Sequence, residues 1–221
     1  GATTSSVMYE ESLDVNVSVV GNDFDSCSSA PYMSSSATSA LFNVNMVIDD
    51  NTITNCSYPM FFEFEASYTA VVNRNIEITN NSIVGSSSGI YFTTSLEQNE
   101  YADYNETVLI EGNSIQGVGS GIYQSFEKSY SGGDIDREWS ILNNTIEGCS
   151  YAGLYLYQEY TSSERGECNY DLTIDGNTIQ DNEGYGVYVS HSVSYTAASA
   201  INHTITRNNI SNNAGNGIQL Y

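Results

Sequence analysis

Positive charge is scarce in this chain. It has five lysine and arginine residues against 27 aspartates and glutamates, which gives 221 residues a formal net charge of −22. Phosphate binding needs clustered Lys and Arg, so the composition argues against a nucleic-acid partner. A surface this acidic repels itself, and we expect cations, high salt or bound sugar to relieve the repulsion.

Long apolar runs and proline are also lacking. No apolar run approaches the ~20 residues of a membrane-spanning helix and no basic amphipathic stretch occurs, so membrane insertion is not expected. The chain has two prolines and starts at Gly1 without a visible signal peptide, which predicts a mature, processed product or an excised piece. Eighteen tyrosines, seven phenylalanines and regularly spaced Ile and Val indicate an ordered chain.

What the chain does contain is a repeat of about 31 residues. An asparagine is followed two residues later by an apolar side chain, and successive asparagines are 29, 30, 32, 31, 33 and 31 residues apart. Apolar residues also recur three and, except at His203, five residues before each asparagine, and spacings of two are the period of a β-strand. Each unit therefore predicts a strand, a bend at the asparagine and a second short strand. The seven asparagines are Asn22, Asn51, Asn81, Asn113, Asn144, Asn177 and Asn208.

A third strand is predicted seven or eight residues after the apolar residue, usually behind a glycine that permits a tight turn. The remaining 10–16 residues of each unit, such as 95–106 and 128–138, are polar and variable and are predicted to be loops. A fixed period of this size is typical of a solenoid. The sequence therefore predicts an all-β, single-stranded parallel β-helix of about seven coils, forming one domain over residues 1–221, with the asparagines stacked in a ladder.

The N-[ST]-I and G-[IV]-Y elements, as in NNSIVGSSSGIYFTT (80–94), resemble the repeats of the right-handed parallel β-helix superfamily, the pectate-lyase-like group. The resemblance covers essentially the whole chain and implies a right-handed helix. Many members of that group cleave or epimerise polysaccharides. A polysaccharide lyase- or epimerase-like enzyme, or a carbohydrate-binding β-helix, is therefore the alternative to a structural function.

The residues needed for such catalysis are scattered. A lyase needs a basic residue beside carboxylates, and a hydrolase needs clustered carboxylates. Arg137 and Arg165 are predicted to form local ion pairs in variable loops. Asp49 and Asp50 are the only adjacent pair of aspartates, and Asp50 is predicted to serve the bend rather than catalysis. His191 is placed in a polar loop, and His203 takes an inward position, so neither is predicted to be catalytic. No cofactor is predicted, although calcium on loop acids stays open, with the candidates Glu97, Glu100 and Asp103, or Asp134, Asp136 and Glu138.

Outward-facing aromatic residues form a second column. They directly follow the apolar residue of the third strand and are predicted to stack about 4.8 Å apart on the outside of the solenoid. The column is interpreted either as a stabilising ladder or as an adhesive stripe for sugar or a neighbouring subunit. Its members are Phe61, Tyr91, Tyr123, Tyr155 and Tyr188.

Cysteines and glycosylation sequons favour an extracellular location. Cys27 and Cys56 share one offset in adjacent coils and are disulfide candidates, as are Cys149 and Cys168; four free thiols are the alternative. Seven N-x-[ST] sequons occur, none on a ladder asparagine. Occupancy by covalent glycans is predicted at several of them, foremost Asn16, Asn105 and Asn202. The full set is Asn16, Asn55, Asn80, Asn105, Asn143, Asn202 and Asn209.

The sequence predicts neither a polar cap nor a terminal helix at the ends of the repeat array, although solenoids normally need them. Residues 1–16 are predicted to complete the last coil of a neighbouring copy, which would give a junction coil of 35 residues from Asn208 to Asn22. The predicted function is a non-enzymatic, glycosylated extracellular structural protein that polymerises head-to-tail into a filament, sheath or surface layer. One slice of a longer β-helical surface protein is the alternative.

Overall fold

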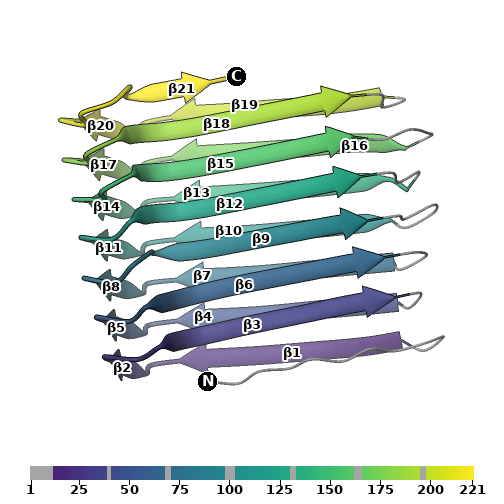
Figure 1. Ribbon diagram of the computed structural model, residues 1–221, viewed down its shortest axis with the longest axis horizontal. Helices are drawn as coiled ribbons and strands as arrows, with labels where there is room; N and C mark the ends of the chain where they lie inside the picture. Colours follow the sequence, from purple (N-terminus) through teal and green to yellow (C-terminus); the bar gives the residue numbers. More distant parts are fainter. Residues whose placement is uncertain are drawn as a thin grey trace.

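The computed structural model describes residues 12–38, 41–67, 71–97, 103–129, 133–161, 166–194 and 198–221. These residues form 21 strands stacked coil upon coil, from β1 at one end to β21 at the other (Figure 1). The described part of the chain is all-β. It contains no helix that is long and apolar enough to cross a membrane.

Three parallel seven-stranded sheets run along the solenoid, so the prediction of about seven coils is confirmed. Sheet A contains, in order, β1 (Ser12–Val20), β4 (Leu41–Asp49), β7 (Val71–Thr79), β10 (Tyr104–Glu111), β13 (Ile135–Leu142), β16 (Glu167–Asp175) and β19 (Ala198–Thr206). Sheet B contains β2 (Asp23–Asp25), β5 (Thr52–Thr54), β8 (Ser82–Val84), β11 (Ser114–Gln116), β14 (Thr145–Glu147), β17 (Thr178–Gln180) and β20 (Asn209–Ser211). Sheet C contains β3 (Ser29–Thr38), β6 (Tyr58–Ser67), β9 (Ile90–Glu97), β12 (Ser120–Ser129), β15 (Ala152–Thr161), β18 (Tyr185–Ser194) and β21 (Ile218–Leu220).

Strands of sheets A and C extend into the stretches predicted to be loops. β9 continues to Glu97 and β10 begins at Tyr104, while β12 includes Lys128 and β13 includes Arg137. These strand ends were not predicted because some of their inward positions carry charged side chains, which are typical of loops. Lys128 and Arg137 are such residues, and both are about 1 % exposed. The predicted loops are therefore shorter than the variable sequence suggests.

Each coil bends at two positions with left-handed backbone. One lies directly before the ladder asparagine and the other lies four residues after it. Asp50, with φ of 55°, occupies the first, so its predicted role in the bend is confirmed. The left-handed region favours Gly and Asn, which explains their recurrence here. The residues are Gly21, Asp50, Asn80, Gly112, Asn143, Gly176 and Arg207 at the first position, and Ser26, Asn55, Gly85, Gly117, Gly148, Asp181 and Asn212 at the second.

The asparagine ladder forms as a directional chain of hydrogen bonds. The backbone N–H and Nδ2 of Asn81 donate to Oδ1 of Asn113 at 2.9 and 3.0 Å. Asn81 Nδ2 also donates to the carbonyl oxygens of Ile48 and Thr79 at 3.0 and 2.8 Å. Each inner ladder amide thus ties its coil to both neighbouring coils, and every bond from one ladder asparagine to another runs toward the next coil. The inner five asparagines, Asn51, Asn81, Asn113, Asn144 and Asn177, are each 1 % exposed.

The glycines at the start of the third strand are explained by close contact between coils, and not by the turn conformation predicted for them. A Cβ atom on Gly121 would lie 2.5 Å from the carbonyl oxygen of Gly153 and 2.4 Å from Cγ2 of Ile146.

We expect Gly121→Ala to lower the free energy of unfolding by about 1–3 kcal/mol through overpacking, measured by chemical denaturation. The matched control is Gly117→Asn. Asparagine already occupies that left-handed position at Asn55 and the site is open, so little loss is expected there.

Candidate functional site

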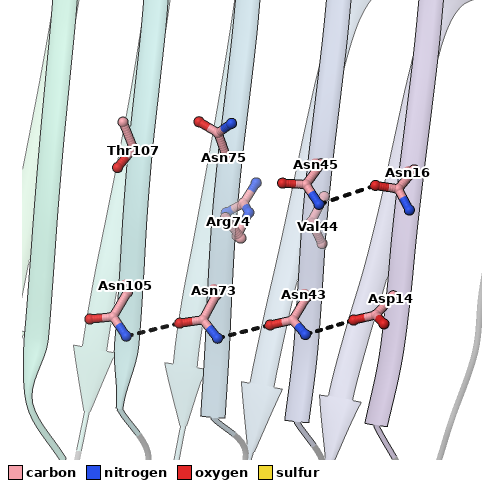
Figure 2. A pocket seen from close by; sticks show the side chains of 10 residues that line it. All are labelled: Asp14, Asn16, Asn43, Val44, Asn45, Asn73, Arg74, Asn75, Asn105 and Thr107. Carbon is pink, nitrogen blue, oxygen red and sulfur yellow. Dashed lines mark hydrogen bonds between the residues drawn. The ribbon is translucent and has the colours of Figure 1, made fainter.

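The outer face of sheet A carries a hollow of about 530 Å³ over its first four coils. Alternation along the strands turns two rows of polar side chains outward, and between them lie Val44 and Arg74, whose side chains are buried on the inner side of the sheet (Figure 2). We call these the amide rows. The first contains Asp14, Asn43, Asn73 and Asn105; the second contains Asn16, Asn45, Asn75 and Thr107.

Hydrogen bonds link the first amide row from coil to coil. Asn43 Nδ2 donates to Asp14 Oδ1 at 2.6 Å, Asn73 Nδ2 to Asn43 Oδ1 at 2.8 Å, and Asn105 Nδ2 to Asn73 Oδ1 at 3.0 Å. In the second row only Asn45 and Asn16 are joined, at 3.1 Å (Figure 2). The row periodicity was visible in the sequence as N-x-N, but it was not interpreted as a site.

The rows turn acidic beyond the fourth coil. Asp136 follows Asn105 in register, and Glu138 and Asp171 follow Thr107. Along the amide rows, the part over the first four coils therefore has Asp14 as its one carboxylate, whereas the part beyond is acidic; Asp49, Glu77 and Glu111 also face outward on the same strands, outside the rows.

The predicted aromatic column lies on the outer face of sheet C and extends to Tyr32. Successive ring centroids are 4.3–5.4 Å apart, and the rings are within 9° of parallel. Burial within the stack, together with Tyr123, raises the pKa of Tyr91 to about 12. The ring faces are occupied by neighbouring rings, so the column presents mainly ring edges outward. This arrangement favours the stabilising ladder over a sugar-stacking stripe.

A smaller hollow of about 230 Å³ lies on the same face of sheet C. Its carboxylates come from Glu63, Glu65 and Glu127, and hydroxyl residues of β9 and β12 lie between them. Carboxylates beside hydroxyls match what the polysaccharide-active alternative requires.

Three of the five basic residues lie inside the solenoid, where the sequence did not place them. Glu106 accepts hydrogen bonds from Arg74 Nη1 at 3.0 Å and from Arg137 Nε at 2.8 Å, and Tyr104 and Trp139 add one each at 2.8 Å. Burial opposes ionisation of Glu106, but Arg137 and Arg74 hold the pKa of its carboxyl below the ordinary value. Arg137 thus forms an ion pair as predicted, but in the core and not in a loop.

Lys128, the only lysine, is also buried. Its Nζ donates to the carbonyl oxygen of Gly133 at 2.7 Å, and burial lowers its pKa. With three cations and Glu106 enclosed, the rest of the chain has two basic residues, Arg165 and Arg207, against 26 acidic ones. The outer surface is therefore still more acidic than the composition suggests. Arg165 lies outside the described residues, so its predicted ion pair is not placed.

The two histidines meet inside the last coils. His191 belongs to β18, and not to the predicted loop, and its Nε2 is 2.8 Å from Nε2 of His203, with the Tyr170 ring beside both. Burial, His203 and Arg137 lower the pKa of His191 to about 4, and burial lowers the pKa of His203.

We expect this pair to weaken the fold in acid. Below a pH of about 6.5 the histidines are protonated in the unfolded chain but stay neutral in the folded protein. The free energy of unfolding therefore decreases as the pH falls toward 4. The measurement is the difference in free energy of unfolding between the wild type and the double variant His191→Gln/His203→Gln. That difference should shift in favour of the variant across this window, and a pH-independent difference would contradict the assignment.

All four cysteines are free thiols, so the predicted disulfides are wrong for this structure. Cys27 and Cys56 do stack on adjacent coils, but the Cys27 backbone N–H donates to Cys56 Sγ at 3.4 Å. Cys149 accompanies Asn182 at the bend, whereas Cys168 lies in sheet A near Lys128, so the second pair is separated. Burial raises the pKa of Cys149 to about 12.

The seven sequon asparagines are all exposed, in contrast to the buried inner ladder. Asn16 and Asn105 open into the hollow of sheet A. For the calcium candidates, no group of three metal-ligating side chains gathers in the described part of the chain, and Glu100 lies outside it.

Comparison with family models matches residues 101–221, more than half of the chain, to the right-handed β-helix region. No curated protein and no solved structure matches. The repeat, the three parallel sheets and this match agree: the chain belongs to the right-handed β-helix family.

Proposed function

We propose that this protein is a non-enzymatic structural protein whose solenoids stack end to end. The direction of the asparagine ladder carries the proposal. At one end, Asn22 donates to Asn51 at 3.0 Å, and among the described residues nothing donates to its own Oδ1. At the other end, Asn208 Nδ2 donates to the Ile174 carbonyl oxygen, and in the described coils its backbone N–H has no acceptor.

These two ends are complementary to each other and not to themselves. A head-to-tail contact brings the Asn208 donors of one copy to the Asn22 oxygen of the next, which repeats the geometry of every inner coil. Partly exposed core side chains, including Phe24 at one end and Ile210 at the other, would be buried by the same contact. Heterologous contacts that do not close produce filaments. The buried positions of Arg74, Lys128 and Arg137 support a non-catalytic role, because a lyase base must reach substrate.

Negative-stain imaging and sedimentation of the purified chain test the proposal. We expect fibres with a subunit period of about 34 Å, from seven coils at ~4.8 Å each. Ile210→Asp, which places a charge on the end coil, should give discrete particles, whereas Val84→Asp, on the outer face of sheet B, should still form fibres. Circular dichroism checks that both variants are folded. Discrete wild-type particles would defeat the proposal and favour a slice of a longer solenoid.

An extracellular, glycosylated state is part of the proposal and rests on the exposed sequons. We expect glycans at several sites, foremost Asn16, Asn105 and Asn202. The intact mass of native material should exceed 24.1 kDa, and a mass equal to that of the bare chain would refute glycosylation.

The carboxylate hollow on sheet C supports a second candidate, action on polysaccharides. Incubation with uronic-acid polymers tests it. The appearance of unsaturated products would replace the structural assignment, and Glu63→Gln and Glu127→Gln would then show whether this hollow is the site.

A further inference from the structure

We infer that the amide rows on sheet A form a binding site for an uncharged, polyhydroxylated chain such as a neutral oligosaccharide. Each primary amide has two N–H donors and two acceptor positions. Asn73 uses one of each within its row, donating to Asn43 and accepting from Asn105. One donor and one acceptor of Asn73 therefore remain available at the hollow.

The second amide row has more free capacity. Within the described coils, the Asn75 amide and the Thr107 hydroxyl make no side-chain hydrogen bond, although both line the hollow (Figure 2). Groups that donate and accept side by side match sugar hydroxyls, which do the same.

The dimensions suit an extended ligand. On each strand, the residue of the first row and the residue of the second row are two positions apart, which is about 6.6 Å. Neighbouring coils are about 4.8 Å apart. The volume of about 530 Å³ falls within the range of small-molecule sites. Four coils supply the lining, so a chain of several sugar residues can lie along the solenoid axis.

Charge narrows the ligand class. Asp14, at the outer edge of the hollow, carries the only carboxylate in its lining. An anionic saccharide would be repelled by outward carboxylates such as Glu77 and Glu111 around the hollow, and a cation would favour the acidic part of the rows at Asp136, Glu138 and Asp171. These charges therefore favour a neutral ligand that binds by hydrogen bonds alone. Its dissociation constant should be on the order of millimolar, because water competes for each hydrogen bond.

The test uses the full chain produced without N-glycosylation, so that no glycan on Asn16 or Asn105 enters the hollow. Side-chain amide signals are followed by two-dimensional NMR during titration with cellohexaose and mannohexaose. We expect saturable shifts at Asn45, Asn73 and Asn75. Asn75→Ala should weaken binding about 3- to 10-fold, the effect of one lost hydrogen bond, whereas Asn169→Ala, in register with the first amide row but outside the hollow, should leave it unchanged.

Three outcomes would overturn the inference. One is the absence of saturable shifts for both sugars. Another is shifts confined to the outer face of sheet C. The third is amide shifts that follow protein concentration without sugar, which would make a second copy the occupant of the hollow. Asn75 forms no side-chain bond among the described residues, so its alanine variant should fold normally, and unchanged amide dispersion verifies this. Failure of this test leaves end-to-end stacking unaffected, since the two rest on different residues.

Discussion

Replacing Glu106 with alanine is expected to lower the free energy of unfolding by about 3–5 kcal/mol. The carboxylate is about 3 % exposed and is the only anionic partner of Arg74 and Arg137 within the described core. Removing it leaves two guanidinium groups buried without a counterion. It also removes the acceptor for the Trp139 indole N–H. Denaturant unfolding monitored by circular dichroism measures the loss.

Two further variants separate a buried charge effect from general sensitivity. Glu65→Ala removes an exposed carboxylate and should change stability by less than about 0.5 kcal/mol. The triple variant Glu106→Leu/Arg74→Leu/Arg137→Met should recover much of the loss, because an apolar core can replace a buried ion cluster. A loss below about 1 kcal/mol for Glu106→Ala would show that the cluster is not what the contacts indicate.

The second large effect is expected at the centre of the ladder. Asn113→Ala removes the acceptor for the backbone N–H and Nδ2 of Asn81 and the donor to the Ile78 carbonyl oxygen. A buried group left without a partner costs about 1–3 kcal/mol, so we expect a total loss of roughly 2–5 kcal/mol. The measurement is again the free energy of unfolding, supplemented by amide hydrogen exchange at Asn81.

Asn105→Ala is the matched control for the ladder. Asn105 is also a stacked asparagine, but it is exposed and donates a single side-chain bond to Asn73. Its loss should be below about 1 kcal/mol, since water replaces the missing partner. Equal losses at Asn113 and Asn105 would argue that burial of the ladder contributes nothing.

The fold was predictable because its determinants repeat in the sequence. Ile83, Ile115 and Ile146 recur at one offset from the ladder asparagines, and each lies fully buried in sheet B. One repeat therefore fixes the register of its neighbours, and errors in a single coil do not change the prediction. The aromatic column followed from the same argument, since a residue next to an inward one must face outward.

Features that occur in only one or two coils were not predictable. Arg137 and Lys128 occupy inward positions that repetition assigns to apolar residues, and polar side chains there look like a loop. Their burial depends on single partners: Glu106, 31 residues before Arg137, and Gly133, five residues after Lys128. No repeating pattern in the sequence indicates either pairing. The hollow was missed for another reason. Outward asparagines indicate only a polar surface until the strands of four coils bring them together.

Electron cryomicroscopy of the purified chain at high concentration tests the central claim most directly. The account predicts filaments in which Asn22 of one copy lies within hydrogen-bond distance of Asn208 of the next, with sheets A, B and C continuous across the junction. Isolated solenoids, or filaments joined by side-by-side contacts with both end coils left open, would contradict it.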